Sequence, residues 1–235
     1  MNPQDTLKRP AKKRQPGGMV ILHEDKDILV VVKPAGLLTV GSDRDKSRTA
    51  HYLLNDYVRK GDPKSRHRVY VVHRLDQDTS GILIFAKSEA AKKTLQENWE
   101  TTDKHYLAVL NGQLAEKEGK ISSYLAENSA QRVYSTTDAA KGKLAHTEYK
   151  VLQEGKGLSL VEIHLLTGRK HQIRVHFAEM GHPVVGDKKY GNDAKFTKRL
   201  ALHARSITFA HPYNGRPMSF DAGMPDDFSR LLGKP

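Results

Sequence analysis

Residues 69–86 read VYVVHRLDQDTSGILIFA, two apolar runs on either side of a charged loop. The runs Val69–Val72 and Ile82–Ala86 are rich in β-branched residues, which favour strands. The loop Arg74–Gly81 carries acidic and basic side chains and ends in Thr-Ser-Gly, which is typical of a turn. Catalytic groups often lie on such loops, because the flanking strands hold them rigidly. The stretch therefore predicts two strands of one sheet and singles out the loop between them.

Two roles are open to Asp76, in the middle of this loop. Its carboxylate could attack carbon as a nucleophile or accept a proton as a general base. It could instead only accept hydrogen bonds from backbone N–H groups of the turn, which is common for Asp in such loops. The local residue pattern alone favours the turn.

Short β-rich runs on both sides of this stretch predict further strands. Met19–His23 and Ile28–Lys33 are separated by a polar break, and Pro34-Ala35-Gly36 ends the second run. Downstream strands are predicted at Tyr106–Leu110, Val133–Thr136, Ala145–Leu152, Leu158–Leu166 and Ser206–Phe209. From Val161 to Leu165 every second residue is apolar, which predicts one fully apolar strand face.

Three segments have the apolar spacing of helices. They are Thr49–Lys60, a segment from the capping residue Ser88 to about Trp99, and His171–Met180. The residues of the third helix expected to face inward are Ile173, Phe177 and Met180. Many strands with few helices predict an α+β fold: a single domain on a mixed, mostly antiparallel sheet flanked by helices and loops.

The composition narrows the class of protein. The chain has 235 residues, with 39 Lys and Arg against 27 Asp and Glu, and no cysteine. The net charge of +12 points to a polyanionic partner, with nucleic acid the first candidate. The lack of cysteine excludes disulfides and thiol catalysis and fits a reducing cytoplasm. No apolar run is long enough to span a membrane. Met1–Gly18 predicts a basic tail, either a disordered solubilising end or an electrostatic arm that contacts phosphates. Residues 19–235 are expected to form the one folded domain.

Several standard sites are missing from the sequence. It has no G-x-x-x-x-G-K-[ST] phosphate loop, no H-E-x-x-H zinc motif and no G-x-S-x-G nucleophile elbow. Among the 12 histidines, His171 and His176 diverge on their predicted helix, and His203 and His211 lie at opposite ends of a strand-like run. Without cysteine or a nearby carboxylate pair, the sequence predicts no metal site.

A second charged cluster, Thr167–His176, opens the third predicted helix. Backbone N–H groups and the helix dipole attract anions at a helix N-terminus, and basic side chains add to this attraction. The cluster is therefore a candidate phosphate-binding segment.

The two charged clusters resemble motifs of the RluA family of pseudouridine synthases. His73-Arg74-Leu75-Asp76-x-x-Thr79-Ser80-Gly81 is similar to the signature loop of that family. The other similar motifs are Val32–Leu37, Lys104–Val109, Leu166–His176 followed by Gly181-His182-Pro183 and Gly186-Asp187-x-x-Tyr190-Gly191, and Leu200–Ala204. They stand in the order of the family and cover about Val20 to Phe228, nearly everything but the tail.

The resemblance implies that the chain converts uridine to pseudouridine in RNA, by breaking the glycosidic N–C bond, turning the base and rejoining it through carbon. Asp76 matches the essential aspartate nucleophile, which overturns the turn interpretation. Tyr106 matches the tyrosine that stacks on the uracil and takes part in proton transfer at C5. Arg174 matches the arginine that pairs with the aspartate and keeps it ionised. We expect that pair to be planar and bidentate.

Further residues are expected to contact the RNA. Ile173 would form an apolar wall under the base, and Arg74 would fill the gap left by a flipped-out uridine. The remaining RNA or uridine contacts expected from the matching motifs are Leu75, Arg169, Lys170 and His171. The resemblance implies no metal and no organic cofactor.

The expected substrate is a structured RNA, a stem-loop of ribosomal or transfer RNA, bound by a cytoplasmic monomer. Many relatives carry an N-terminal S4 RNA-binding domain, for which the residues before Met19 leave no room. Affinity is then expected to come from Lys and Arg contacts to phosphates. The alternative is a non-catalytic RNA-binding protein or ribosome-assembly factor on the same fold. Loss of the aspartate, tyrosine or arginine would favour that alternative, and all three are present.

Overall fold

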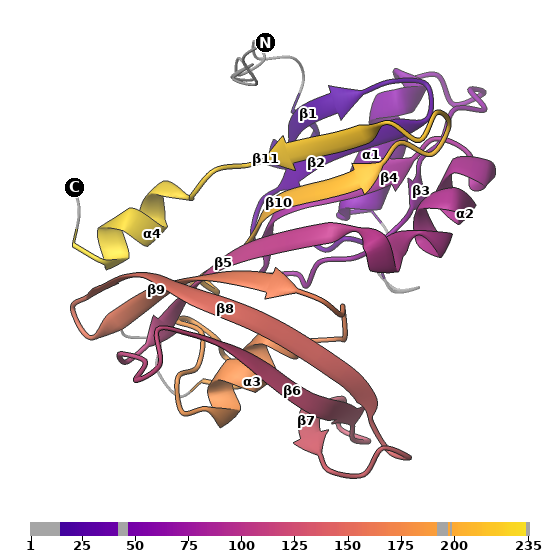
Figure 1. Cartoon of the computed structure of the whole chain (residues 1–235). Helices are drawn as coiled ribbons and strands as arrows, with labels where there is room; N and C mark the ends of the chain where they lie inside the picture. Colours follow the sequence, from indigo (N-terminus) through magenta and orange to yellow (C-terminus); the bar gives the residue numbers. More distant parts are fainter. Residues whose placement is uncertain (1–14, 42–46, 192–196, 198, 234–235) are drawn as a thin grey trace, which may run out of the picture.

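The computed structural model describes residues 15–41, 47–191, 197 and 199–233. In these ranges eleven strands form one sheet in the order β1-β2-β4-β10-β5-β9-β8-β6-β7, with β3 paired to β4 and β11 to β10 (Figure 1). The β4–β10 pair is parallel, and the other pairs of this sheet are antiparallel. The predicted α+β fold with a mixed, mostly antiparallel sheet is confirmed.

The elements have the following bounds. The strands are β1 (Val20–Glu24), β2 (Ile28–Lys33), β3 (Tyr70–Val71), β4 (Ser80–Ala86), β5 (Asp103–Asn111), β6 (Glu118–Glu127), β7 (Val133–Thr136), β8 (Lys143–Gly155), β9 (Leu158–Leu165), β10 (Leu202–Ala210) and β11 (Pro217–Asp221). The α-helices are α1 (Ala50–Arg59), α2 (Glu89–Glu97), α3 (Gln172–Glu179) and α4 (Asp226–Leu231), and short 3₁₀ turns occur at η1 (Pro16–Gly18) and η2 (Trp99–Thr101).

The predicted helix starts are confirmed by their caps. The Thr49 hydroxyl accepts a hydrogen bond from the Tyr52 N–H at 3.2 Å, and the Ser88 hydroxyl accepts one from the Ala91 N–H at 3.1 Å. Each bond satisfies a backbone donor that lacks a partner inside the first turn of the helix. The second helix ends at Glu97, and Trp99 lies in η2 instead of the α-helix.

Three elements were missed by the sequence analysis: β6, β11 and α4. β6 contains glycine and two serines, and β11 begins with proline, so neither has the composition of a strand. Both form because neighbouring strands supply hydrogen-bond partners, β8 and β7 for β6 and β10 for β11. The six residues of α4 are too few for a clear helical period.

Two further expectations are corrected. Met180 was expected to face inward, yet it is 40% exposed, because α3 ends at Glu179 and Met180 lies at its C-terminal cap. Ile173 and Phe177 are buried as predicted. The tail was expected to reach Gly18, but Pro16–Gly18 forms a helical turn against α1; residues 1–14 lie outside the described residues.

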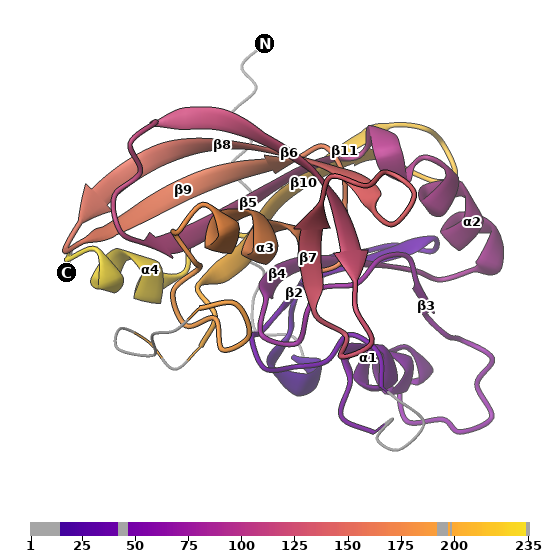
Figure 2. The same cartoon turned by 90° about the horizontal axis from the view of Figure 1, so that it is seen from below.

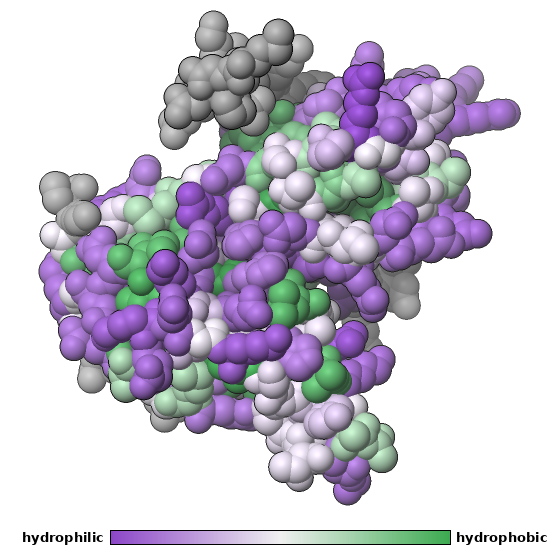
Figure 3. Space-filling model, viewed as in Figure 1, coloured by the Kyte–Doolittle hydropathy of each residue, from purple (hydrophilic) through white to green (hydrophobic). Residues whose placement is uncertain are grey.

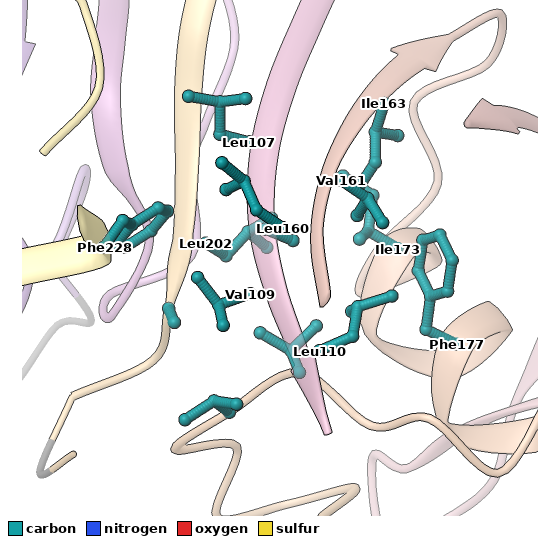
Figure 4. Packing of buried hydrophobic residues seen from close by; sticks show 14 of the residues in the cluster. Leu107, Val109, Leu110, Leu160, Val161, Ile163, Ile173, Phe177, Leu202 and Phe228 are labelled. Atoms are coloured by element: carbon teal, nitrogen blue, oxygen red, sulfur yellow. The ribbon is translucent and has the colours of Figure 1, made fainter. Parts of the chain in front are cut away.

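The helices enclose the sheet from different sides. α1 packs with buried β2 and β4 residues such as Leu29 and Phe85, whereas α2 packs with Val30 and Ile84, which alternate with them along the same strands. The two helices therefore cover opposite faces of that half of the sheet. α3 lies against β8 and β7 at the other end (Figures 1 and 2). Figure 4 shows its Ile173 and Phe177 beside residues of β9 in the largest buried cluster.

The parallel pair of β4 and β10 brings the signature loop to the centre of the molecule. Gly81, at the start of β4, has φ +118° and lies against Ala204 of β10. A Cβ atom at Gly81 would be 2.2 Å from the Ala204 carbonyl oxygen, so only glycine fits this close approach. Because β10 also pairs with β5, the loop before β4 lies next to the residues of β5.

The outer surface is mostly polar. On the face seen in Figure 3, hydrophilic residues surround small, separate hydrophobic areas. None of the helices in the described ranges is long and apolar enough to cross a membrane.

Candidate active site

A pocket of about 100 Å³ lies where the β3–β4 loop, β5, β9 and the start of α3 meet. Residues far apart in the chain meet there because β5 pairs with both β9 and β10. The pocket is lined by Arg74, Leu75, Asp76, Thr79, Tyr106, Leu165, Gly168, Arg169, His171, Gln172, Ile173, Arg174 and Leu202. It therefore brings together both charged clusters of the sequence and eight of the nine predicted site residues.

The loop that carries Asp76 is held by side chains from the preceding segment. The Thr39 hydroxyl donates to the Leu75 carbonyl at 2.8 Å and accepts from the Leu75 N–H at 3.2 Å. The Lys33 ammonium donates to the carbonyls of Pro34, Leu37 and Gln77 at 2.7–3.0 Å. Both contacts fix the backbone on either side of Asp76.

Lys33 is fully buried, which is unusual for a lysine. Burial lowers its pKa to about 8, against the opposing effect of the nearby Asp78 and Asp76. Its three carbonyl partners replace the water that the ammonium has lost. The sequence motif Val32–Leu37 contained this residue, but no feature of the local sequence indicated its burial.

Arg174 joins two carboxylates. Its Nη1 donates to Asp76 Oδ2 at 3.0 Å, while its Nε and Nη2 donate to the two oxygens of Asp187 at 2.7 and 2.8 Å. The expected bidentate pair with Asp76 is thus wrong in its geometry: the two-point contact belongs to Asp187, and Asp76 receives a single hydrogen bond. The two carboxylates raise the pKa of Arg174, despite its burial, so the guanidinium is always charged.

Asp187 is the main site residue that the sequence analysis missed. Its side chain is 0% exposed, and Oδ1 also accepts from the N–H groups of Lys189 and Tyr190 at 2.9 and 3.0 Å. Burial opposes its ionisation, but Arg174 and these N–H donors outweigh it and lower the pKa of Asp187. The signal for it was the stretch Gly186-Asp187-x-x-Tyr190-Gly191, to which the sequence analysis assigned no role.

Tyr106 and three apolar residues form one apolar wall of the pocket. Tyr106 is directly opposite Ile163 across β5 and β9, so its ring emerges on the face that α3 covers. Leu165, Ile173 and Leu202 line the pocket beside it. Burial and the nearby Asp76 carboxylate raise the pKa of Tyr106, so the phenol is protonated at neutral pH.

His171 occupies the junction between the two charged clusters. Its Nδ1 lies 2.7 Å from the Tyr190 hydroxyl, and its Nε2 lies 3.7 Å from Asp76 Oδ2. Its φ of 55° is left-handed, a conformation that costs a non-glycine residue about 1–2 kcal/mol. Burial lowers its pKa, the Asp76 carboxylate opposes this, and Arg174, Lys189 and Lys170 add to the lowering.

The other predicted RNA contacts surround the pocket mouth. Arg74 is exposed, whereas Leu75 is buried beneath the loop. Arg169 donates from Nε to the Leu144 carbonyl at 3.0 Å, and Lys170 pairs with Glu127 of β6. Lys170 does not line the pocket itself but an adjoining hollow, which Asp76 also borders. The structure therefore brings all nine predicted residues to one place.

Two groups of His and Asp lie away from this pocket. They are Asp103, His105 and His164, and Asp25, Asp27 and His211. The expectation that no carboxylate pair lies near the histidines is wrong for the second group, because the fold brings Asp25 and Asp27 to His211, which the sequence separates from them. Asp25 already accepts hydrogen bonds from His23, His211 and two backbone N–H groups. Neither group borders the pocket that contains Asp76.

Comparison with known proteins gives a consistent result. The profile of the RNA pseudouridylate synthase family matches residues 27–179. An uncharacterized RNA pseudouridine synthase of Bacillus subtilis is 38% identical over 221 residues, which cover 92% of this chain and 72% of the relative. The ribosomal large subunit pseudouridine synthase D of Neisseria meningitidis is 36% identical over 233 residues, covering 93% of this chain and 61% of the relative.

Two solved protein structures have a similar fold. The human RNA pseudouridylate synthase domain containing 1 superposes with a TM-score of 0.72 at 28% identity, covering 94% of this chain and 89% of the human chain. The human RNA pseudouridylate synthase domain containing 4 has a TM-score of 0.74 at 23% identity, over 90% of this chain and 91% of the other, and so shows the fold alone.

Proposed function

Because this chain belongs to the RluA family of RNA pseudouridine synthases, we propose that it isomerises specific uridines of ribosomal or transfer RNA with Asp76 as the nucleophile. The reaction replaces the N–C glycosidic bond of a uridine by a C–C bond. The base must leave the sugar, turn and rejoin it through C5, which finally loses its proton. A cofactor-free carboxylate can support these steps because it can both attack carbon and leave again.

The single observation that carries this proposal is the position of Asp76. Its carboxylate is 30% exposed at the edge of the pocket, with the guanidinium of Arg174 at 3.0 Å. On the other side lie Tyr106 and the apolar wall of Ile173. A flat, uncharged base fits between these groups, and Asp76 then lies beside the bond that has to break.

Tyr106 supplies a hydroxyl close to the base. Because its pKa is raised, the phenol is protonated at neutral pH and does not act as a phenolate base. It can pass a proton on while it stacks against the ring of the uracil. We assign to it a part in removing the C5 proton after the base has turned.

The RNA must present its uridine outside the stack. Flipping a base costs a few kcal/mol, which protein contacts have to recover. Arg74 is exposed at the mouth of the pocket and can occupy the space that the uridine leaves. Arg169 and Lys170 are exposed nearby and suit the phosphates of a stem-loop. The monomeric state and the cytoplasmic location stay predictions.

The test compares pseudouridine maps of total cellular RNA from cells with this gene, without it, and with an Asp76→Asn allele. The amide has nearly the size of the carboxylate but no negative charge. We expect defined pseudouridines in ribosomal or transfer RNA to disappear equally in the second and third strains. A map that Asp76→Asn leaves unchanged would remove Asp76 from the nucleophile role. Maps identical in all three strains would favour an RNA-binding protein without this activity.

A further inference from the structure

A second hollow of about 360 Å³ also borders Asp76. The two spaces adjoin, because both are bordered by Arg74, Leu75, Asp76, His171 and Arg174. The first pocket has apolar walls suited to a base. The second hollow differs in having Lys170 and Lys189 on its border, and it has no aromatic ring among the described residues that line it apart from His171.

We propose that this second hollow binds a phosphodiester group of the RNA strand next to the target uridine, with Lys189 as its main ligand. The inference rests on the proposed function, because it takes the base to occupy the first pocket. A nucleotide whose base occupies the first pocket has its sugar beside Asp76, which borders both spaces. A phosphate attached to that sugar is then close to the adjoining second hollow.

Among the described residues, no carboxylate forms an ion pair with the Lys189 ammonium, although Asp76 and Asp78 border the same hollow and Glu127 lies close enough for Lys170 and, more weakly, Lys189 to lower its pKa. The Nζ of Lys189 donates to the carbonyl oxygen of Gln131 at 2.6 Å, a neutral acceptor in the turn between β6 and β7. A carbonyl satisfies one donor but leaves the net charge in place. Such a cation at a solvent-open hollow attracts phosphate strongly.

The backbone of Lys189 is fixed relative to Asp76. Its N–H donates to Asp187 Oδ1 at 2.9 Å, and Asp187 holds Arg174, which in turn holds Asp76. Its carbonyl accepts from Arg132 Nη1 at 2.6 Å. A phosphate bound by Lys189 would therefore position the sugar of the same nucleotide against the carboxylate that acts on it.

Lys170 can join this contact at a small cost. It now pairs with Glu127, but both side chains are about 40% exposed. Exposed ion pairs of this kind are screened by solvent and contribute little to stability. Lys170 can therefore give up its ion pair with Glu127 to bind an RNA phosphate. Lys189 has to give up only its hydrogen bond to the Gln131 carbonyl.

The test couples a lysine substitution to removal of one phosphate charge. Lys189→Gln keeps an N–H donor for the Gln131 carbonyl and removes the charge. The probes are synthetic stem-loops of the RNA segment that the wild-type chain isomerises: one natural, one with a neutral methylphosphonate 5′ of the target uridine, and one with it 3′. Lys188→Gln is the matched control, because Lys188 is exposed and the described residues that line the two hollows do not include it.

For natural RNA we expect Lys189→Gln to weaken binding about tenfold, the size of a charge-assisted hydrogen bond. With the methylphosphonate at one of the two positions, we expect wild type and Lys189→Gln to bind alike, because the contact is then lost in both. Lys188→Gln is expected to bind each of the three probes as wild type does. If Lys189→Gln lowers the binding affinity equally for all three probes, the proposal of a phosphate subsite is wrong. In that case the proposed function still holds if the wild-type protein forms pseudouridine in the natural stem-loop. If the wild-type protein forms no pseudouridine there, the proposed function itself is refuted.

Discussion

Arg174 gives its two-point contact to the buried Asp187 and only one hydrogen bond to Asp76. Asp187 therefore sets the plane and position of the guanidinium, and Asp76 accepts one hydrogen bond from Nη1 at 3.0 Å. This arrangement leaves the exposed oxygens of Asp76 free of a rigid two-point clamp. A nucleophile needs this freedom, because one of its oxygens has to approach the substrate.

Asp187→Asn tests this relationship. The asparagine amide has only one oxygen, so it cannot accept the hydrogen bonds from Nε and Nη2 of Arg174 on two separate oxygens. The buried guanidinium also loses one of its two carboxylate partners. We expect the single-turnover rate of pseudouridine formation to fall at least about tenfold, since a buried charge-assisted contact contributes roughly 1.5–3 kcal/mol. The free energy of unfolding, from urea denaturation, is expected to fall by about 3–5 kcal/mol. Asp62→Asn, on an exposed loop, is the control. An unchanged rate in a folded Asp187→Asn protein would contradict the positioning role.

Arg174→Lys separates a positioning role from RNA binding. Lysine offers one point charge and cannot hold Asp187 and Asp76 at once in the geometry of the guanidinium. We expect most of the single-turnover activity to be lost, while the dissociation constant for the stem-loop changes less than threefold or so. If the dissociation constant rises and the single-turnover rate persists, Arg174 is a phosphate contact and its pairing with Asp76 has no catalytic consequence.

Tyr106→Phe keeps the ring and removes the hydroxyl. RNA affinity is expected to stay close to wild type, because stacking survives. Release of tritium from uridine labelled at C5 is expected to slow by about 10²–10⁴-fold, the usual contribution of a positioned proton-transfer group. Tyr134→Phe is expected to have no effect, because the Tyr134 side chain on β7 is exposed and lies outside the pocket. Wild-type tritium release from Tyr106→Phe would show that the hydroxyl does not move the C5 proton.

Thr39→Val tests how the signature loop is held. Valine has the shape of threonine but neither hydrogen bond to Leu75, so it leaves a buried backbone N–H and carbonyl without this partner. We expect a loss of about 1–3 kcal/mol in the free energy of unfolding and a lower turnover. Thr39→Ser restores the hydroxyl and is expected to restore turnover. Equal turnover in the valine and serine variants would show that the hydroxyl does not position Asp76.

The buried His176 predicts a dependence of stability on pH. Burial lowers its pKa to about 4, and its ring nitrogens contact the hydroxyls of Thr147 and Ser123 at 2.9 and 3.0 Å. In the unfolded chain a histidine has a pKa of about 6.5, so between about pH 6.5 and 4 the unfolded state binds more protons than the folded state. Stability therefore falls as the pH falls through this window, by about 1.4 kcal/mol per pH unit for each such group.

Urea denaturation at several pH values measures this slope. In His176→Gln the slope between pH 6.5 and 4 is expected to be shallower by about one proton. His67→Gln, on an exposed loop, is expected to keep the wild-type slope. A wild-type slope in His176→Gln would mean that other groups cause the acid sensitivity.

Much of the fold could be predicted because its signals are local. The run Ile28–Lys33, the alternation from Val161 to Leu165, the helical spacing that begins at Thr49 and the cap Ser88 each reflect neighbours within one element. β6 and β11 could not be found in this way, because their strand form depends on hydrogen bonds to β8 and β10. Met180 was misplaced for a similar reason: the helical period gave its direction, but the end of α3 determined its exposure.

The sequence by itself determined which groups could do chemistry here: a carboxylate at Asp76, a phenol at Tyr106 and a guanidinium at Arg174, each in a recognisable motif. Only the tertiary structure decided how they meet. Asp76 and Arg174 are 98 residues apart, and their contact depends on the pairing of β4, β10, β5 and β9. It also decided that Asp187 takes the two-point contact and that the charge of Lys189 borders a hollow beside Asp76. Hydrogen-bond partners and burial are properties of distance in space, and no local periodicity encodes them.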